Sequence, residues 1–289
     1  MSAAIDTQDD FTVRPMRPDE VELAIHWAQR EGWNPGLHDA TCFQAADPDG
    51  FFIGTLRGEP VGSISAVRYG GHFGFIGLYI VRPEFRGKGF GYRIWQHAMT
   101  YLAGRNIGLD GVVEQQDNYR KSGFQLAHRN VRFQGIARPR RARMPSVAIK
   151  ELRGLPFAQL MPYDLSHFPA SRERFLANWI VQPDSIALAA MHDRDIRGYG
   201  VLRKCCNGHK IGPLFADDAT TAQALLDALI SHREGETFVL DVPEPNTEAI
   251  ALAREYGMAS VFETARMYTK AAPAIALAHV FGITTFELG

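Results

Sequence analysis

The stretch of sequence that decides the fold is VRPEFRGKGFGYRIW, at residues 81–95. Three glycines alternate there with larger residues, directly after Arg86. An apolar run, FGFIGLYIV at 73–81, precedes the glycines, and a run with helical character, YRIWQHAMTYLA at 92–103, follows them. The continuous apolar run is typical of a strand covered on both faces. The stretch therefore predicts a strand, a glycine-rich turn and a helix in succession.

A glycine-rich turn between a strand and a helix is suited to binding an anion. The first N–H groups of a helix have no partner within the helix, and this end carries a partial positive charge. Glycines let a phosphate approach the backbone closely, while Arg86 and Lys88 add positive charge. We therefore interpret the turn as a phosphate or pyrophosphate site. It is not a P-loop, since GxxxxGK(S/T) is absent, and it does not match the dinucleotide fingerprint GxGxxG.

The composition is that of an ordinary soluble globular protein, with 289 residues, of which 46% are hydrophobic and 22% charged. A formal net charge of −1 argues against a general attraction to nucleic acid or to an anionic membrane. No apolar run reaches the length of a membrane span, and the acidic, polar start MSAAIDTQDD is unlike a secretory signal. The three cysteines form neither a CxxC pair nor a disulfide framework. These features predict a cytoplasmic protein without a metal site, nucleic-acid partner or membrane association. A monomer or homodimer is expected, although nothing in the composition selects between them.

The order of the predicted elements occurs twice along the chain, and the two halves also align residue by residue. FIGLYIV at 75–81 aligns with KIGPLFA at 210–216, and Leu109-Asp110 aligns with Leu240-Asp241. The offset stays between about 131 and 135 residues, which is typical of an internal repeat. The sequence therefore predicts two domains of one fold.

The boundary between the two predicted domains follows from composition. Residues 1–135 form the first domain and residues 147–289 the second. The segment 136–146 is rich in Pro and Arg and free of apolar periodicity, so it is predicted to be a linker. The last ten residues, VFGITTFELG at 280–289, are apolar and patterned as a strand, so we expect them to dock against the rest of the molecule.

Two motifs in the first half resemble those of a known family. RGKGFG at 86–91 is similar to the R/Q-x-x-G-x-G/A motif of the GNAT acyltransferase superfamily. Asn118 and Tyr119, followed by Gly123-Phe124, resemble the family's later N…Y-x-x-x-G-F segment. The resemblance covers residues 11–135 well. It implies an α/β protein (α+β, with mixed sheets) of two tandem GNAT-like domains, each a mostly antiparallel mixed sheet flanked by helices.

The second half, at 146–270, resembles the family as a degenerate copy. Its loop, ADDATTAQ, has no glycine and contains two acidic residues, so we do not expect it to hold a pyrophosphate. The resemblance therefore implies that the first domain binds acetyl-CoA and that the second forms a wall of the acceptor site. The candidates for that wall are His209, Cys205 and Asp241.

The resemblance implies an N-acetyltransferase in which the primary amine of a small molecule attacks the thioester of acetyl-CoA. Backbone N–H groups of the glycine turn would hold the pyrophosphate, and the backbone of residues 79–81 would pair with the pantetheine arm like an added strand. A backbone N–H near Ile80 or Val81 would polarise the thioester oxygen. The implied cofactor-binding residues are Tyr79, Ile80, Val81, Arg86, Gly87, Lys88, Gly89, Phe90, Gly91, Tyr92 and Asn118.

Two further roles implied by the resemblance concern Tyr119 and Asn118. Tyr119 lies four residues before Gly123, where the family places a tyrosine that protonates the departing thiolate. A phenol, with an ordinary pKa of about 10, suits a thiol leaving group of similar basicity. Asn118 resembles the family's cofactor-contacting asparagine, and capping of a helix N-terminus is an equal alternative for it.

A base must also be found, because an ammonium has to lose a proton before it can attack. Many family members place a glutamate on the fourth strand, but this chain has Phe75 at that position. Asp110, on the fifth predicted strand, is therefore taken as the catalytic candidate. Its match with Asp241 in the second copy also fits a shared structural role. The other candidates for the base are Glu114, His72, Tyr79 and a chain of water molecules.

Other functions fit parts of the sequence. The same chemistry could act on protein lysines or N-termini, and the missing fourth-strand glutamate also fits a non-catalytic acyl-CoA-binding regulatory module. Cys205-Cys206 could supply a nucleophile, but the sequence indicates no His–Asp arrangement beside the pair that would activate a thiol. A basic cluster comprises Arg138, Arg140, Arg141 and Arg143. Nucleic-acid binding by this cluster is disfavoured by the net charge and by the lack of flanking aromatic residues, so a linker is the preferred interpretation.

Overall fold

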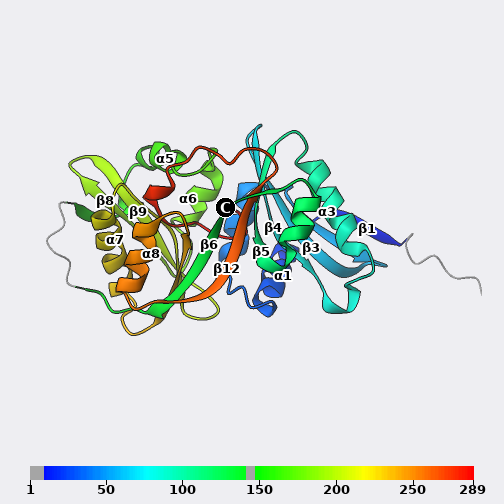
Figure 1. The fold of residues 1–289 in the computed structure, drawn as a ribbon, viewed down its shortest axis with the longest axis horizontal. Helices are drawn as coiled ribbons and strands as arrows, with labels where there is room; N and C mark the ends of the chain where they lie inside the picture. The colour runs from blue at the N-terminus through cyan, green and yellow to red at the C-terminus, as the bar shows by residue number, and fades with distance from the viewer. Residues whose placement is uncertain (1–9, 141–146) are drawn as a thin grey trace, which may run out of the picture.

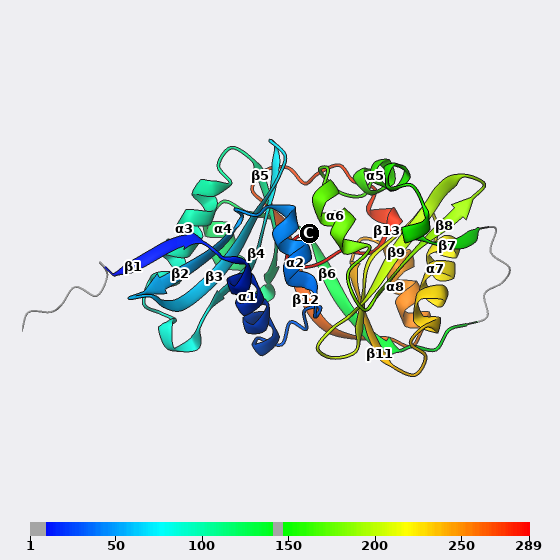
Figure 2. The ribbon, with the colours of Figure 1, turned by 180° about the vertical axis from the view of Figure 1, so that it is seen from behind.

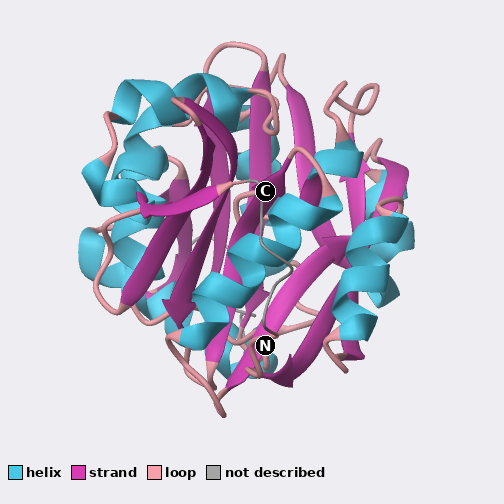
Figure 3. Cartoon of the chain, turned by 90° about the vertical axis from the view of Figure 1, so that its left-hand side faces the viewer, coloured by secondary structure: helices cyan, strands magenta, loops and turns pink. Residues whose placement is uncertain are grey.

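Thirteen strands form one continuous mixed sheet in the computed structural model, which describes residues 10–140 and 147–289 (Figure 1). Helices cover both faces of this sheet, as the view in Figure 3 shows. This confirms the predicted α/β class with mixed sheets flanked by helices. The elements of the first copy are β1 (Phe11–Pro15), α1 (Pro18–Arg30), α2 (Asp39–Ala46), β2 (Phe51–Leu56), β3 (Glu59–Tyr69), β4 (Phe73–Val81), α3 (Phe90–Tyr101), β5 (Asn106–Val112), α4 (Gln116–Lys121) and β6 (Gln125–Ile136).

The second copy repeats this order within the described residues. Its elements are β7 (Ala148–Glu151), α5 (Phe157–Leu165), α6 (Glu173–Trp179), β8 (Ser185–His192), β9 (Asp195–Lys204), β10 (His209–Ala216), α7 (Ala219–Ser231), β11 (Thr237–Pro243), α8 (Thr247–Glu255), β12 (Ala259–Tyr268) and β13 (Val280–Gly282). The glycine turn lies between β4 and α3, as predicted. The sequence does not predict helix α2, because DATCFQAA has little amphipathic pattern from which to infer a helix.

The two copies exchange their closing strands. Strand β12 of the second copy lies between β5 and β6 of the first, and β6 in turn pairs with β11 of the second copy. Figure 1 shows β6 and β12 crossing the middle of the molecule side by side. The proposed boundary at 136–146 therefore divides the sequence into two copies but does not divide the sheet. Of that segment, residues 141–146, with Arg141 and Arg143, lie outside the described residues.

The described part of the linker contacts the second copy. The backbone N–H of Arg140 donates to Asp227, and the Arg140 guanidinium lies 3.6 Å from the Glu255 carboxylate and over the Tyr256 ring. Arg140 is thus engaged with acidic and aromatic groups of its own chain.

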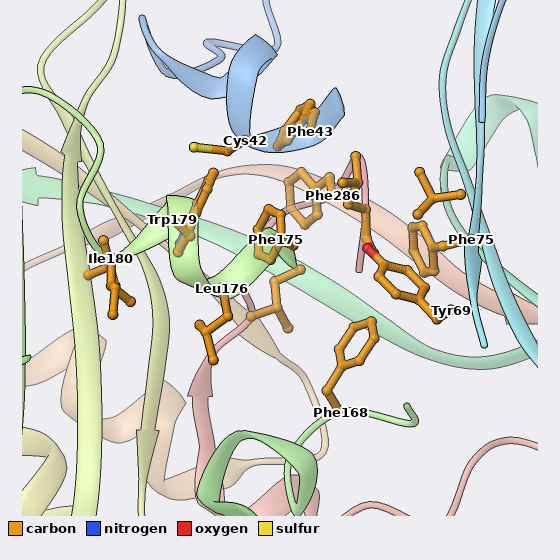
Figure 4. Close-up of a cluster of buried hydrophobic side chains, with 14 of the residues drawn as sticks. Cys42, Phe43, Tyr69, Phe75, Phe168, Phe175, Leu176, Trp179, Ile180 and Phe286 are labelled. Atoms are coloured by element: carbon orange, nitrogen blue, oxygen red, sulfur yellow. The ribbon is translucent and has the colours of Figure 1, made fainter. Parts of the chain in front are cut away.

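A hydrophobic cluster shared by both copies joins them at the centre. Helices α2 and α6 meet there (Figure 2), where the rings of Phe43 and Trp179 are stacked with centroids 6.1 Å apart. The cluster continues through Phe75 and Phe286, so that side chains from the sheet, the helices and the tail pack together (Figure 4). An ion pair between Arg203 and Asp39, at 2.9 Å and fully buried, also crosses from one copy to the other. Because both copies contribute side chains to this one cluster, its burial stabilises them jointly, and neither copy has a separate core at this face.

The C-terminal tail runs through this central region. Only β13 is a strand, paired with β10, and residues 283–289 are irregular and buried. The N–H of Ile283 donates to the backbone oxygen of Asp241 in β11, and the Tyr69 hydroxyl donates to the backbone oxygen of Leu288. The prediction that the tail docks is confirmed, while its strand is shorter than predicted because the tail leaves β10 to reach the first copy.

Candidate active site

Strands β4 and β5 separate part of the way along their length. They pair in parallel from Phe73 to Ile76, and no further pairing between them follows in the described residues. Leu78 has φ of +45°, an uncommon conformation for a leucine, at a point where the register between β3 and β4 also shifts. Past this β-bulge, residues 77–81 do not pair with β5, and their edge toward β5 is open apart from the Val81 oxygen, which accepts from Arg86. The edge can accept an extended ligand in the manner of an added strand.

A cavity of about 1190 Å³ occupies the opening between the two strands. It extends from the glycine turn and α3, past β4, β5 and α4, to β12 and the tail. Its lining includes Tyr79, Ile80, Val81, Arg86, Gly87, Gly89, Gly91, Tyr92, Trp95, Asp110, Asn118 and Tyr119, and also Glu31, Trp33, Phe262, Thr264, Phe286 and Glu287. All the residues predicted to bind the cofactor except Lys88 and Phe90 therefore line one cavity, as does Tyr119, while Asp110 borders it with a fully buried side chain.

The glycine turn has the geometry of an anion cradle. Gly87 and Gly89 have φ of +74° and +83°, and no atom lies within 4 Å of where a Cβ would stand on either residue. Gly89 is the N-cap of α3. In the described structure, the backbone N–H groups of residues 87–92 have no backbone acceptor. A helix of twelve residues adds its partial positive charge at this point, so the turn fits a phosphate or pyrophosphate.

The two cations of the turn differ in their surroundings. The Arg86 guanidinium donates through Nε to the Val81 backbone oxygen at 2.7 Å and pairs at 2.5 Å with Glu31, the C-cap residue of α1. Lys88 is exposed, with Nζ 5.6 Å from the Phe85 ring centroid. Arg86 therefore connects the turn to α1, while Lys88 is free to meet an anion from solvent.

Tyr119, on α4, is one of the residues that line the cavity. Its ring packs against β5, since a Cβ on Gly111 would stand 2.2 Å from Tyr119 Cε2, and its centroid is 5.6 Å from that of Trp95. Burial raises the pKa of the Tyr119 phenol to about 12, with a smaller contribution from Tyr79, and burial likewise raises the pKa of Tyr79 to about 12. Tyr119 is thus a neutral phenol at neutral pH, able to donate a proton. Asn118 lines the cavity next to it, and its Nδ2 donates to Gln115 rather than capping a helix.

Asp110 faces a cation instead of the open cavity. Its side chain is fully buried, and its two oxygens accept from Arg266 at 2.8 and 2.6 Å, with Asn130 donating a third hydrogen bond at 2.7 Å. Burial raises the pKa of the Asp110 carboxyl, and the Arg266 charge acts in the opposite direction. Asp241, its counterpart in the second copy, is paired in the same way with Arg132 at 2.7 Å. The geometry favours the structural alternative for Asp110, which is to fasten the exchanged strand β12 to β5.

Exchanging Asp110 for asparagine (Asp110→Asn) is expected to lower the free energy of unfolding by about 3 kcal/mol or more, because Arg266 would be left buried without its partner. Urea denaturation of both proteins measures this. The matched control is Asp117→Asn, whose exposed pair with Arg120 contributes less than about 1 kcal/mol. Equal losses in the two variants would show that the Asp110–Arg266 pair does not hold β12 in place.

The remaining candidates for a base or an acceptor wall lie elsewhere. His72 and Glu114 are exposed and do not line the cavity. His209, Cys205 and Asp241 are buried in the second copy, and these three also lie outside the cavity lining. Burial raises the pKa of the Cys205 thiol, which disfavours a thiolate nucleophile. The second copy instead contributes to the cavity through β12 and the tail.

The corresponding region of the second copy is closed by its own chain. Asp218 caps α7, its carboxylate accepting from the N–H of Thr221 at 2.7 Å, so an acidic group occupies the place of the glycine turn. Strand β13 pairs with β10 where β10 and β11 separate, and a Cβ on Gly212 would stand 2.4 Å from the Thr284 backbone oxygen. The tail thus fills the opening that is free in the first copy.

Comparisons with known proteins agree with this geometry. Residues 19–124 match the acetyltransferase (GNAT) family, and residues 160–282 match an acetyltransferase (GNAT) domain. The chain is 28% identical over 280 residues to holothin acyltransferase of Pseudoalteromonas sp. (strain SANK 73390), covering 96% of this chain and 95% of the relative.

Solved structures share the fold. An acetyltransferase candidate from Pyrococcus horikoshii superposes with a TM-score of 0.82 at 21% identity, covering 100% of this chain and 99% of the other. A tandem GNAT protein from the clavulanic acid biosynthesis pathway superposes with a TM-score of 0.62 at 12% identity, covering 91% of this chain and 99% of the other.

None of the helices in the described residues is long and apolar enough to cross a membrane.

Proposed function

Since the chain belongs to the GNAT superfamily and is an acyltransferase, we propose that it moves an acetyl group from acetyl-CoA to the primary amine of a small molecule. The observation that carries this proposal is the open glycine cradle at the N-terminus of α3. The cradle leads directly into a cavity of about 1190 Å³ between β4 and β5. Only the first copy has this arrangement among the described residues, so the proposed reaction takes place there.

The cavity would accommodate the pyrophosphate, the pantetheine arm and the thioester of acetyl-CoA. Backbone N–H groups of residues 87–91 would hold the pyrophosphate, with Lys88 adding charge from solvent. The free edge at residues 79–81 would pair with the pantetheine arm, with Asn118 beside it. A backbone N–H at Ile80 or Val81 would polarise the thioester oxygen. Tyr119, held neutral by burial, would protonate the departing thiolate.

The acceptor would enter from the side of the cavity away from the glycine turn. Three aromatic side chains gather there, Trp33 after α1, Phe262 on β12 and Phe286 on the tail. Such walls favour a small amine with an apolar or aromatic body. Strand β12 and the tail of the second copy wall this side of the cavity, and a confined entrance favours a small molecule over a protein lysine. Holothin, from which the similar acyltransferase takes its name, belongs among the candidates to be tested.

A panel of amines tests the proposed function. Purified protein with acetyl-CoA would be offered holothin, benzylamine, spermidine and a lysine-containing peptide, with release of the CoA thiol followed optically and the acetylated product identified by mass. We expect the highest kcat/KM with an aromatic or apolar amine. The highest kcat/KM with the peptide would instead favour a protein acetyltransferase. Binding of acetyl-CoA without turnover of any amine would favour an acyl-CoA-binding regulatory module.

Introducing a methyl group at Gly111 (Gly111→Ala) is expected to lower kcat about tenfold or more, because the new Cβ would displace the Tyr119 ring against which it stands. Overpacking of this kind also costs about 1–3 kcal/mol of stability. The thiol-release assay and thermal unfolding measure the two effects. Gly154→Ala, at an exposed glycine with open space around it, is the matched control. A kcat equal to that of the control would show that the Tyr119 position is not required.

A further inference from the structure

The tail carries a carboxylate whose environment is unusual. Glu287, the third residue from the C-terminus, is 3% exposed and lines the cavity. Its Oε2 atom is buried and has no hydrogen-bond partner among the described residues. A buried carboxylate oxygen without a donor costs stability, and such a group is normally paired. Because Glu287 lines the cavity, we look for the missing partner in a ligand bound there.

Glu287 is placed beside the bulge of β4. A Cβ on Gly77 would stand 2.0 Å from the Glu287 backbone oxygen, so only glycine allows the tail to lie this close. Two residues earlier on β4, Phe75 is buried, and its ring would lie 3.0 Å from a Cβ on Gly289. Neighbouring Phe286 packs into the shared cluster, as Figure 4 shows, and fixes the tail at this point. The tail therefore brings the Glu287 carboxylate to the part of β4 where the strand itself carries the apolar Phe75.

We propose that Glu287 binds the ammonium group of the acceptor and accepts the proton that it must lose before it attacks the thioester. This inference rests on the proposed function, since it assigns a residue to the acceptor side of the same cavity. It assigns the base to a segment that is far from the glycine turn in the sequence.

Three cationic side chains lie in the surroundings of Glu287. Arg132 on β6, Arg203 on β9 and Lys210 on β10 all interact electrostatically with Glu287. Two of these cations have their own acids, Asp241 for Arg132 and Asp39 for Arg203. Lys210 has none: its Nζ atom is buried without a hydrogen-bond partner among the described residues. Of the acids that line the cavity, Asp110 is held by Arg266 and Glu31 by Arg86. Lys210 is thus the one of these three cations without an acid of its own among the described residues, although burial lowers its pKa.

The protons balance in this scheme. The acceptor ammonium gives a proton to Glu287, and the free amine forms a C–N bond to the thioester carbon. The C–S bond then breaks, and the departing thiolate takes the Tyr119 proton. The nitrogen, still carrying one proton too many for an amide, returns a proton to the tyrosine oxygen, directly or through solvent. The proton on Glu287 leaves to solvent, so one proton is released for each amide and each CoA thiol formed.

The test compares Glu287→Gln, which keeps the shape of the side chain, with Glu263→Gln, an exposed exchange of the same type on β12. We expect Glu287→Gln to lower kcat/KM for the amine about 100-fold at neutral pH, within the range for a general base. The loss should shrink as the pH rises toward the pKa of the amine, because free amine then needs no base. Acetyl-CoA affinity, measured by calorimetry without an amine, should stay within about twofold of wild type. Infrared difference spectra between wild type and Glu287→Gln should show an ionised carboxylate at neutral pH.

Three results would overturn this assignment while leaving the proposed function intact. One is equal kcat/KM for Glu287→Gln and Glu263→Gln. Another is loss of acetyl-CoA affinity in Glu287→Gln, which would indicate a structural role for the tail. The third is a protonated Glu287 at neutral pH in the infrared spectra. Wild-type protein that acetylates none of the amines would refute the proposed function itself, and the assignment of Glu287 with it.

Discussion

Replacing Gly89 by glutamate (Gly89→Glu) is expected to weaken acetyl-CoA binding by about 100-fold or more. Gly89 caps α3 with φ of +83°, and its N–H belongs to the group that faces the cavity without a backbone acceptor. A side chain here would fill the cradle, and its negative charge would repel the pyrophosphate. Equilibrium dialysis with radiolabelled acetyl-CoA measures the loss.

Strain at a positive φ must be separated from loss of the site. Gly104 provides the control, because it has φ of +84°, is exposed, and has open space where a Cβ would stand. Gly104→Glu therefore carries the same backbone cost, roughly 1–2 kcal/mol, without touching the cradle. We expect it to bind acetyl-CoA like wild type. Retention of wild-type affinity by Gly89→Glu would show that the glycine turn is structural.

Removing the Tyr119 hydroxyl (Tyr119→Phe) is expected to lower kcat about 100-fold and to change acetyl-CoA affinity less than about twofold. The phenylalanine ring keeps the packing on Gly111 and Trp95, so only the proton donor is lost. Thiol release at saturating substrate measures kcat. Tyr256→Phe is the control, since its hydroxyl bonds Asp227 on the outer side of the second copy. Full turnover in Tyr119→Phe would remove this residue from the mechanism.

The pH dependence of kcat adds a second check on Tyr119. A phenol whose pKa is raised to about 12 remains an acid throughout the neutral and moderately alkaline range. We therefore expect no fall in kcat from deprotonation of Tyr119 between about pH 7 and about pH 10. A fall in kcat over that range, present in wild type and absent from Tyr119→Phe, would contradict the raised pKa.

The strand, turn and helix around the glycines could be predicted because their signals are local. The apolar run of β4, the glycines and the helical run of α3 each follow from their own residues, and the repeat indicates a second copy of the same fold. Most of the cofactor-binding residues that the family resemblance implies line one cavity.

The acceptor side could not be predicted in the same way. Phe262 and Thr264 reach the cavity only because β12 is exchanged into the first copy, and a swap of two equivalent strands leaves no mark in the periodicity of either. Trp33 follows α1 in a segment whose residues indicate only the end of a helix. Glu287 reaches the bulge of β4 because residues 283–289 are irregular in structure. The apolar pattern of the tail predicts a strand there instead, so the sequence does not indicate where Glu287 lies.

Titration calorimetry of acetyl-CoA into the wild-type protein tests the central claim most directly. The open cradle of the first copy and the filled opening of the second predict saturable binding at one site per chain. Two sites per chain would contradict the closure of the second copy by Asp218 and the tail. No binding would contradict the account as a whole, because the glycine turn would then serve neither acetyl-CoA nor the proposed transfer.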